Sequence, residues 1–494
     1  MKLLFLTTIL VSLANVLAFN NTKKNSCIDT KKIIAYFSEW RYSSYPVSRI
    51  DFSKFTHLNY AFAVIDPNTY ALTGYEGWIL NEVVTAAHNQ DVKVLMSVGG
   101  WYGSRYFTKM TSSENNMKKF AESCKNLIDT YHIDGIDIDW EYPGREGACN
   151  NPDYANDTDN YLKLLKILRE YIGNENIISA AVSITPFEKN GQPITNLAPY
   201  AEYFDFINIM GYDFAGSWSS VTSHHAALYD PEAGDILSIS SGVNNWLNGQ
   251  FPADKIVIGV PTYGKSWIVS STSRNGLYQS IVNGNPRGDH EDSSDSWTNY
   301  CGIVESGFSG SWKYKNIRNE ILLSSYNTSS GSWIRTWDDN VKCPYLFNKD
   351  TKQIISYDDP ESIGYKAKFV LENGFAGMMV WELENDTDDF EILTAINNQL
   401  GCDGSSINDN TCPKSEYPCC EDCVVVYEDN QKWGILNNDW CSTPYSCDNI
   451  IESCWSEIYG YPCCSGCDVI YEESETMRWG VENNDWCGII NSNC

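Results

Sequence analysis

Three carboxylates alternate with apolar side chains in the segment that runs from Asp134 to Pro143. Successive side chains of a β-strand point to opposite faces, so a strand here would stack Asp137, Asp139 and Glu141 on one face. Each of these groups makes its neighbours harder to ionise, and we expect at least one raised pKa. Because stability is a poor reason to keep such an arrangement, we predict that the segment serves chemistry.

Two other interpretations of this segment stay open. A charged edge strand is one of them, although the opposite face is apolar and the stretch ends in Trp140-Glu141-Tyr142-Pro143. A divalent-cation site is the other, and it would need ligands from elsewhere in the chain. We favour neither, so the sequence predicts no metal and no cofactor.

The pattern Asp-x-x-Asp-x-Asp-x-Glu from Asp134 to Glu141 resembles the signature of the family 18 glycoside hydrolases, the chitinases with a (β/α)8 barrel. The resemblance implies that Glu141 is the general acid. It also implies that Asp139 binds the acetamido N–H of the −1 sugar and stabilises an oxazolinium ion, that Asp137 shares a proton with Asp139, and that Tyr212 binds the acetamido oxygen. The implied reaction is substrate-assisted hydrolysis, with retention, of β-1,4-linked N-acetylglucosamine polymers.

Short β-rich runs alternate with amphipathic helical stretches such as Thr158–Tyr171, where apolar residues recur at helical spacing. This alternation predicts parallel strands joined by right-handed helical crossovers, which close into a (β/α)8 TIM barrel with its catalytic groups at the C-terminal strand ends. The eight predicted strands are Ile33–Phe37, His57–Val64, Lys93–Val98, Gly135–Glu141, Ile177–Ile184, Phe206–Met210, Lys255–Val260 and Gly374–Trp381.

Other predicted strand ends carry further pieces that resemble this family. The third ends in Gly99-Gly100-Trp101, and the sixth in Met210-Gly211-Tyr212-Asp213. The seventh is followed by Lys265, where the family commonly has arginine, so the bidentate contact of an arginine is not expected there. The substrate-binding residues that the resemblance implies are Tyr36 and Tyr263 at the −1 wall, Trp381 as the −1 floor, Trp101 and Trp218 on the +1 and +2 side, and Gly100, Met210 and Asp213 near the reacting sugar.

Core packing is the competing interpretation of each tryptophan. For Trp40, Trp78 and Trp333 we favour the core. The three tryptophans at or just past strand ends differ, because sugar rings stack on exposed aromatic side chains. We therefore expect those three to line a polysaccharide cleft.

Residues 1–18 have the features of a secretory signal peptide: an early lysine, a short apolar run and a cleavage site after Ala18. The run is shorter than the roughly 20 residues that span a bilayer. We expect a secreted, extracellular protein with disulfides and without a membrane partner. The formal net charge of −29 argues against a nucleic-acid partner. Asparagines in glycosylation sequons are Asn20, Asn156, Asn327 and Asn385.

The 494 residues exceed one compact domain. We predict a catalytic barrel over residues 28–400, with a small α+β insertion at 264–354 between the seventh and eighth strands. That interval is too long for a plain loop. A polar linker at 403–410 follows the barrel.

Residues 411–448 and 453–494 form an internal repeat, and residues 412–494 hold 12 of the 18 cysteines. We predict two small disulfide-rich modules. Zinc is disfavoured by the secreted context and by the absence of histidines there. The doublet resembles fungal-type dockerins, which implies a scaffold protein (scaffoldin) as partner in a cellulosome-like complex. A carbohydrate-binding module is the alternative. The residues we assign to the docking face are Tyr417, Asp429, Trp433, Tyr461 and Trp479, whereas we expect Trp440 and Trp486 in the module cores.

The sequence therefore predicts a secreted retaining chitinase whose ligands are chitin or chito-oligosaccharides. A chitin-binding lectin on the same barrel is one rival, although Glu141 and both aspartates are present. An endoglycosidase acting on N-glycans is another. Endo or exo action and the disulfide pairing stay open, because six cysteines allow 15 connectivities.

Overall fold

The computed structural model describes residues 31–400 except Asn283, together with residues 420, 427–428, 432–436, 439–442, 464, 471–472, 478–482 and 485–488. The predicted signal peptide (1–18) and linker (403–410) lie outside these residues. The chain divides into two compact units, Met1–Asp403 and Gly404–Cys494.

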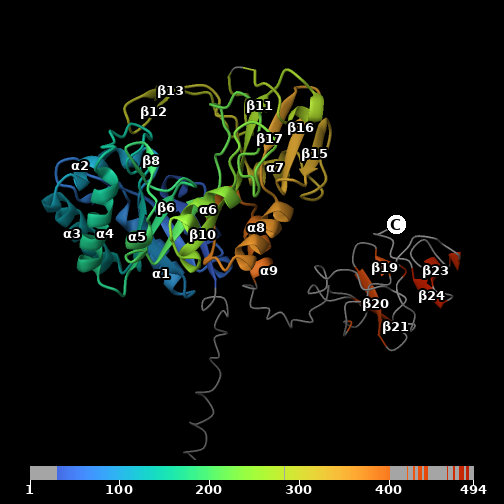
Figure 1. The fold of residues 1–494 in the computed structure, drawn as a ribbon, viewed down its shortest axis with the longest axis horizontal. Coiled ribbons are helices and arrows are strands. Elements are labelled where there is room, and N and C mark those ends of the chain that lie inside the picture. Colours follow the sequence, from blue (N-terminus) through green and yellow to red (C-terminus); the bar gives the residue numbers. More distant parts are fainter. Residues whose placement is uncertain are drawn as a thin grey trace, which may run out of the picture. The chain divides into compact units, whose positions relative to one another are not determined.

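Parallel strands in the first unit close into a barrel, which confirms the predicted (β/α)8 fold (Figure 1). The strand order is β1-β18-β10-β9-β6-β5-β4-β2, and pairing of β2 with β1 completes the ring. A short strand, β3 (Leu72–Thr73), adds to β2 at the edge. The barrel strands are β1 (Lys32–Ser38), β2 (His57–Ile65), β4 (Lys93–Gly99), β5 (Gly135–Asp139), β6 (Ile177–Val182), β9 (Phe206–Met210), β10 (Ile256–Pro261) and β18 (Gly377–Trp381).

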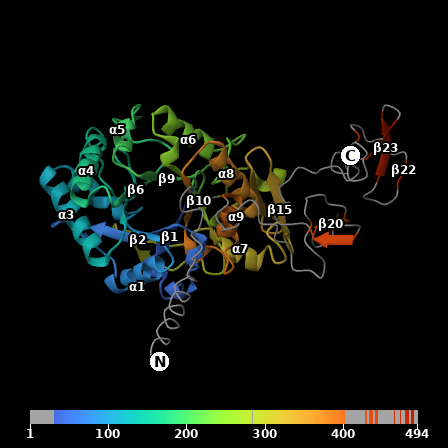
Figure 2. The same cartoon turned by 90° about the horizontal axis from the view of Figure 1, so that it is seen from below.

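Helices surround the barrel strands, as the view from below shows (Figure 2). Helix α4 illustrates why they form: Tyr161, Leu164, Leu165 and Leu168 lie on one face and are buried, and Gly173 follows its last turn. Asp359 caps α8 by accepting hydrogen bonds from the N–H groups of the first turn. The helices of this layer are α1 (Gly77–His88), α2 (Phe107–Thr111), α3 (Glu114–Tyr131), α4 (Asp157–Ile172), α5 (Ala198–Ala201), α6 (Ile239–Asn248), α8 (Pro360–Glu372) and α9 (Glu391–Leu400).

Two apolar regions stabilise the barrel. The larger one fills the space between strands and helices. The smaller one lies inside the barrel and includes Ile34, Leu95, Phe206, Val257 and Met379. The interior of the barrel is therefore largely apolar, and a few inward-facing positions carry polar side chains. The site described below is built from these positions.

The predicted α+β insertion between the seventh and eighth barrel strands is present. Its antiparallel sheet has the order β14-β11-β17-β16-β15 and packs with one helix. The members are β11 (Tyr263–Ile268), β14 (Ser311–Lys313), α7 (Tyr314–Glu320), β15 (Trp333–Asp338), β16 (Cys343–Asn348) and β17 (Gln353–Ser356). Two small hairpins are β7 (Glu188–Lys189) with β8 (Gln192–Pro193), and β12 (Trp297–Thr298) with β13 (Val304–Glu305).

The two cysteine-rich modules repeat one structure. Each has a three-stranded antiparallel sheet, and the register of the second copies the first. Disulfides join Cys420 to Cys441 in the first module and Cys464 to Cys487 in the second. The strands are β19 (Tyr427–Glu428), β20 (Lys432–Leu436), β21 (Asp439–Ser442), β22 (Tyr471–Glu472), β23 (Arg478–Glu482) and β24 (Asp485–Gly488).

One expectation about the cysteine-rich modules is wrong, and one of the sequons is buried. Trp440 is 40% exposed and does not lie in a module core. The sequon asparagine Asn385 is buried and hydrogen-bonded to Glu382, so a glycan would have no room there, whereas Asn156 and Asn327 are exposed. The side chain of Trp486 and all of Asn20 lie outside the described residues. In the part of the chain that the structure describes, no helix is long and apolar enough to cross a membrane.

Candidate active site

Asp137 lies inside the barrel, fully buried, and receives hydrogen bonds from several strands. Its Oδ2 accepts from the Tyr36 hydroxyl at 2.7 Å and from Ser97 Oγ at 2.8 Å, while Oδ1 accepts from Ser179 Oγ at 2.6 Å and Asn208 Nδ2 at 3.4 Å. Burial raises the pKa of Asp137, and these four donors oppose the rise. The donors hold the carboxyl in one orientation.

Asp139, two residues further along β5, has the opposite environment. It is buried, and its Oδ1 has no hydrogen-bond partner. Burial raises the pKa of Asp139 well above its usual value of 3.8, and the neighbouring charges of Glu141 and Asp137 raise it further. An unpartnered carboxyl oxygen in such a place is costly, and a ligand N–H would satisfy it.

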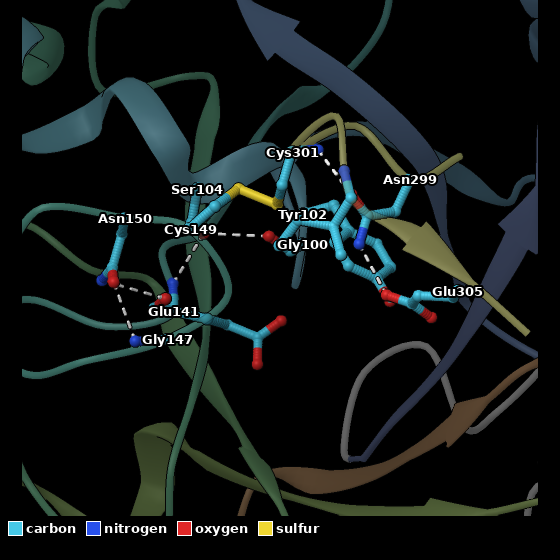
Figure 3. Close-up of a disulfide and its surroundings, with 11 residues drawn as sticks. Gly100, Tyr102, Ser104, Glu141, Gly147, Cys149, Asn150, Asn299, Cys301 and Glu305 are labelled. Carbon is cyan, nitrogen blue, oxygen red and sulfur yellow. Dashed lines mark hydrogen bonds between the residues drawn. A yellow bond between two sulfur atoms is a disulfide. The ribbon is translucent and has the colours of Figure 1, made fainter. Parts of the chain in front are cut away.

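Glu141 lies just past the end of β5 and is almost fully buried. Its backbone N–H donates to Ser104 Oγ at 2.8 Å, and Ser104 in turn donates to the carbonyls of Gly100 and Asp139 (Figure 3). Burial raises the pKa of the Glu141 carboxyl to about 7. At neutral pH a carboxyl with that pKa is protonated in a large fraction of molecules, as a general acid must be.

The Gly99-Gly100 pair permits this close approach. Both residues have positive φ, +116° and +78°. A Cβ at Gly99 would lie 2.2 Å from the carbonyl oxygen of Asp139, and one at Gly100 would lie 2.7 Å from the Phe62 ring. Any side chain here would push the loop away from β5, so the glycines are needed for packing around the carboxylates.

Asp213 forms a second charged group beside Tyr212. Its Oδ1 accepts a hydrogen bond from the Tyr263 hydroxyl at 2.6 Å and lies 3.2 Å from Lys265 Nζ. Burial alone would raise the pKa of Asp213, but the charge of Lys265, the His225 ring with its Nδ1 3.7 Å away, and the hydrogen bond from Tyr263 hold it below its usual range. Lys265 therefore makes a single charged contact here, without the fork of an arginine.

Tyr212 follows β9 and is half-buried. Its ring contacts Tyr263 edge to face, with the ring centroids 6.2 Å apart. Burial, and then the charge of Asp139, raises the pKa of its hydroxyl well above 10. The hydroxyl therefore keeps its proton and can donate a hydrogen bond to a ligand near Asp139.

An aromatic cluster lies where β1, β2 and β18 end. Trp381 stacks on Phe62 with centroids 5.7 Å apart, and it also contacts Tyr36 and Trp40. Trp40 is 54% exposed, so its predicted place in the core is wrong. Phe62 was not predicted: a bulge between Ala61 and Ala63 breaks the alternation of β2, and nothing in the sequence marks it.

The remaining predicted tryptophans and Met210 differ in exposure. Trp101 and Trp218 are 47% and 63% exposed, and Lys265 Nζ lies 5.4 Å from the Trp218 ring centroid. Trp78, which we placed in the core, is exposed instead and contacts Tyr42. Trp333 is half-buried and packs on the core, as expected. Met210 ends β9 and is half-buried.

The structure thus gathers, at one end of the barrel, residues that the sequence placed far apart. Three of the Asp137 donors, Ser97, Ser179 and Asn208, were missed, because one small polar residue in an apolar strand is no signal by itself. Of the predicted docking residues, only Trp433 has a described side chain, and it is half-buried. In the described residues, no group of three or more histidine, cysteine, aspartate or glutamate side chains could hold a metal ion.

A carboxyl whose pKa is raised to about 7, at the mouth of a (β/α)8 barrel and beside exposed aromatic rings, defines a carbohydrate-cleaving barrel enzyme. Comparison with known proteins gives the family. Glycosyl hydrolases family 18 matches residues 32–386, and the chain belongs to that family. A second family, described as a cellulose or protein binding domain, matches residues 411–443 and 453–489.

Individual relatives match the barrel part of the chain. A "chitinase-like effector" of Moniliophthora roreri is 34% identical over 382 residues, which cover 74% of this chain and 92% of that protein. Chitinase A1 of Niallia circulans is 29% identical over 420 residues, covering 72% of this chain and 57% of that longer protein. The crystal structure of chitinase RmChi1 from Rhizomucor miehei superposes with a TM-score of 0.68 at 32% identity and covers 75% of this chain and all of that chain.

Proposed function

We propose that the protein is a secreted chitinase that hydrolyses β-1,4-linked N-acetylglucosamine polymers with retention, through a substrate-assisted step. In this step Glu141 protonates the glycosidic oxygen, and the acetamido oxygen of the −1 sugar attacks the anomeric carbon. The glycosidic bond breaks as the new carbon–oxygen bond forms, which gives an oxazolinium ion. Glu141, now ionised, then takes a proton from the water that opens this ion.

One observation carries this proposal. Asp139 presents a buried carboxyl oxygen without a partner next to the carboxyl of Glu141, whose pKa is raised to about 7. An acetamido N–H would provide the missing donor, and the carboxylate would stabilise the positive charge that develops on the ring. Tyr212, whose hydroxyl stays protonated, would donate to the acetamido oxygen and orient it.

Asp137 has a different part in the proposed mechanism. Four donors form hydrogen bonds with its two oxygens, and these bonds hold Asp137 in place while Asp139 changes partners. When Asp139 binds the substrate, the nearby negative charge of Asp137 makes it favourable for Asp139 to keep a proton or to accept a hydrogen bond from the acetamido N–H. We therefore assign Asp137 a positioning role, in which it acts through Asp139.

Chitohexaose is the substrate that tests this function. The wild-type protein should release short oligomers whose new ends are the β-anomer, observed by NMR directly after cleavage. Glu141→Gln should retain binding and lose several orders of magnitude in turnover. If both proteins bind chitohexaose and neither cleaves it, the barrel is a chitin-binding lectin; α-anomeric products would refute retention.

The cysteine-rich modules suggest a second part of the function. We propose that they dock the enzyme onto a scaffold protein, as fungal-type dockerins do, with Tyr417, Asp429, Trp433, Tyr461 and Trp479 on the docking face. The match to a cellulose or protein binding domain supports attachment, and carbohydrate is the alternative ligand. The three disulfides of the described residues are in keeping with a secreted protein.

Truncation tests the modular part. A protein that ends before Cys412 should hydrolyse soluble chito-oligosaccharides at nearly the rate of the full chain, since the barrel is a compact unit of its own. It should no longer bind an immobilised scaffold protein. A large loss of activity on soluble substrate would contradict the modular arrangement, and retained scaffold binding would remove the modules from that role. Loss of binding to insoluble chitin alone would favour a carbohydrate-binding module.

A further inference from the structure

A strap of residues 293–308 leaves the insertion and returns to it at one narrow neck. The side chain of Asp292 closes this neck. Its Oδ1 accepts from the N–H and hydroxyl of Ser309, and its Oδ2 accepts from the N–H groups of Gly288 and Gly310. The hairpin β12–β13 lies within the strap, and each limb of about eight residues can reach roughly 25 Å when extended.

The far end of the strap is fastened to the barrel. Cys301, at the middle of the strap, forms a disulfide with Cys149 in the loop that follows Glu141 (Figure 3). Glu305 accepts a hydrogen bond at 2.9 Å from the hydroxyl of Tyr102, the residue after Trp101. The Tyr102 ring also contacts Trp297 edge to face. These contacts place the strap end on the loops that follow β4 and β5.

The loop that carries Cys149 is itself held firmly. The Asn150 side chain accepts from the N–H of Gly147 at 2.8 Å and donates to the carbonyl of Arg145 at 2.9 Å and, more weakly, of Glu141 at 3.5 Å. The disulfide therefore joins the strap to a rigid turn that begins at the general acid.

Strand order shows what the strap crosses. The insertion follows β10, and in the closed ring β10 lies opposite β4. A segment from the end of β10 to the loops after β4 and β5 must pass across the mouth of the barrel. Figure 1 shows β12 and β13 on a segment that arches from the insertion to the barrel.

The strap thus separates two groups of aromatic side chains. Trp40 follows β1 and Phe62 lies within β2 on one side of it, whereas Trp218 follows β9 on the other. A linear polymer that touches both groups has to run beneath the strap. The polymer is then enclosed by a closed loop of protein, which the Cys149–Cys301 disulfide completes. This loop consists of the strap, β11 and the hydrogen-bonded barrel strands that lead back to Cys149.

We propose that the strap, latched by the Cys149–Cys301 disulfide, restricts how a polymer reaches the site. A chain enters by threading one of its ends beneath the strap. An internal segment of a long chain cannot enter the site from the side. This inference rests on the proposed function, since it needs a linear carbohydrate in the barrel mouth. It assigns a specificity role to two cysteines that take no part in the chemistry.

Binding of end-capped oligosaccharides tests the strap directly. The proteins carry Glu141→Gln so that nothing is cleaved, and the ligands are a long chito-oligosaccharide with no cap, with a bulky protein on one end, or with one on both ends. The latched protein should bind the first two and associate with the doubly capped ligand more slowly by several orders of magnitude, because binding then requires the strap to open. The added pair Cys149→Ser and Cys301→Ser should bind all three at similar rates.

Two further proteins guard against an ambiguous result. If the serine pair does not fold, a shortened strap, with residues 296–306 replaced by two glycines and Cys149→Ser, opens the mouth while keeping the Asp292 neck. As a matched control, Cys420→Ser with Cys441→Ser removes a disulfide from the other unit and should still exclude the doubly capped ligand.

The outcomes separate the two proposals. Equal association of singly and doubly capped ligand with the latched protein would overturn the strap proposal alone. Failure of even the uncapped oligosaccharide to bind would overturn the proposed substrate and the strap proposal with it. Exclusion that is lost equally in the control pair would show a general effect of disulfide removal and would also overturn the latch.

Discussion

Glu141→Gln should make the barrel more stable, and the gain should grow with pH. Glutamine keeps the shape of the side chain and cannot ionise. In the folded wild-type protein the pKa of Glu141 is about 7, against a usual 4.5. Between these values the folded state holds the proton and the unfolded state does not, so the free energy of unfolding falls as pH rises. Above the folded pKa the whole cost is present.

The size of the gain follows from the same values. The difference between 4.5 and about 7 corresponds to about 3 kcal/mol of unfolding free energy. With about 2.1 cal/mol/K of unfolding entropy per residue and the roughly 370 residues of 31–400, this equals an increase of about 4 °C in Tm. Removal of the charge also relieves Asp139, whose pKa the charge of Glu141 raises, so the gain should not be smaller.

Calorimetry of both proteins between about pH 4 and about pH 9 measures this effect. The two Tm values should coincide at the acidic end and separate through neutrality, with the variant higher. Glu202→Gln, at an exposed position after α5, controls for the loss of a surface charge. A difference in Tm that is the same at every pH would refute the reasoning, because burial would then not be what keeps Glu141 protonated.

Three other changes test the surroundings of the site. Ser179→Ala removes a donor to Asp137, which should raise the pKa of Asp137 and move the acid limb of the kcat profile to higher pH; an unmoved limb would contradict this. Gly100→Ala should lower the unfolding free energy by about 1–3 kcal/mol in denaturant titrations, because its methyl group would press on Phe62. Trp218→Ala should slow turnover of polymer more than that of a short activated substrate, and equal losses would remove Trp218 from the polymer path.

The strands and the three acidic residues could be predicted because each depends on a local pattern. Short β-rich runs between amphipathic helical stretches predicted all eight barrel strands, and period-two alternation marked the fourth, which carries Asp137 and Asp139 and ends just before Glu141. The ends were less accurate. The last strand begins at Gly377, three residues later than predicted, because residues 374–376 still belong to the turn after α8.

Contacts between strands that are distant in the sequence could not be predicted from it. The hydroxyls of Ser97 and Ser179 meet Asp137 only because their strands align with β5 in one register. The Cys149–Cys301 disulfide spans 152 residues, and no local spacing selects that pair. Trp40 was assigned to the core because a tryptophan is more often buried than exposed; its position in a loop at the barrel mouth depends on how β1 ends.

The hydrogen bonds to Asp137 also have a consequence for how the barrel assembles. Its donors come from β1, β4, β6 and β9, while the acceptor is on β5. A slip of one residue in any of these strands would turn its donor outward, and each lost donor would cost roughly 1–3 kcal/mol at a buried carboxylate. A misaligned barrel is therefore less stable, because it leaves the carboxyl of Asp137 in the site without its donors. Asp137 in this way helps to fix strand alignment together with the apolar faces of the strands, and its replacement should lower the free energy of unfolding of the barrel.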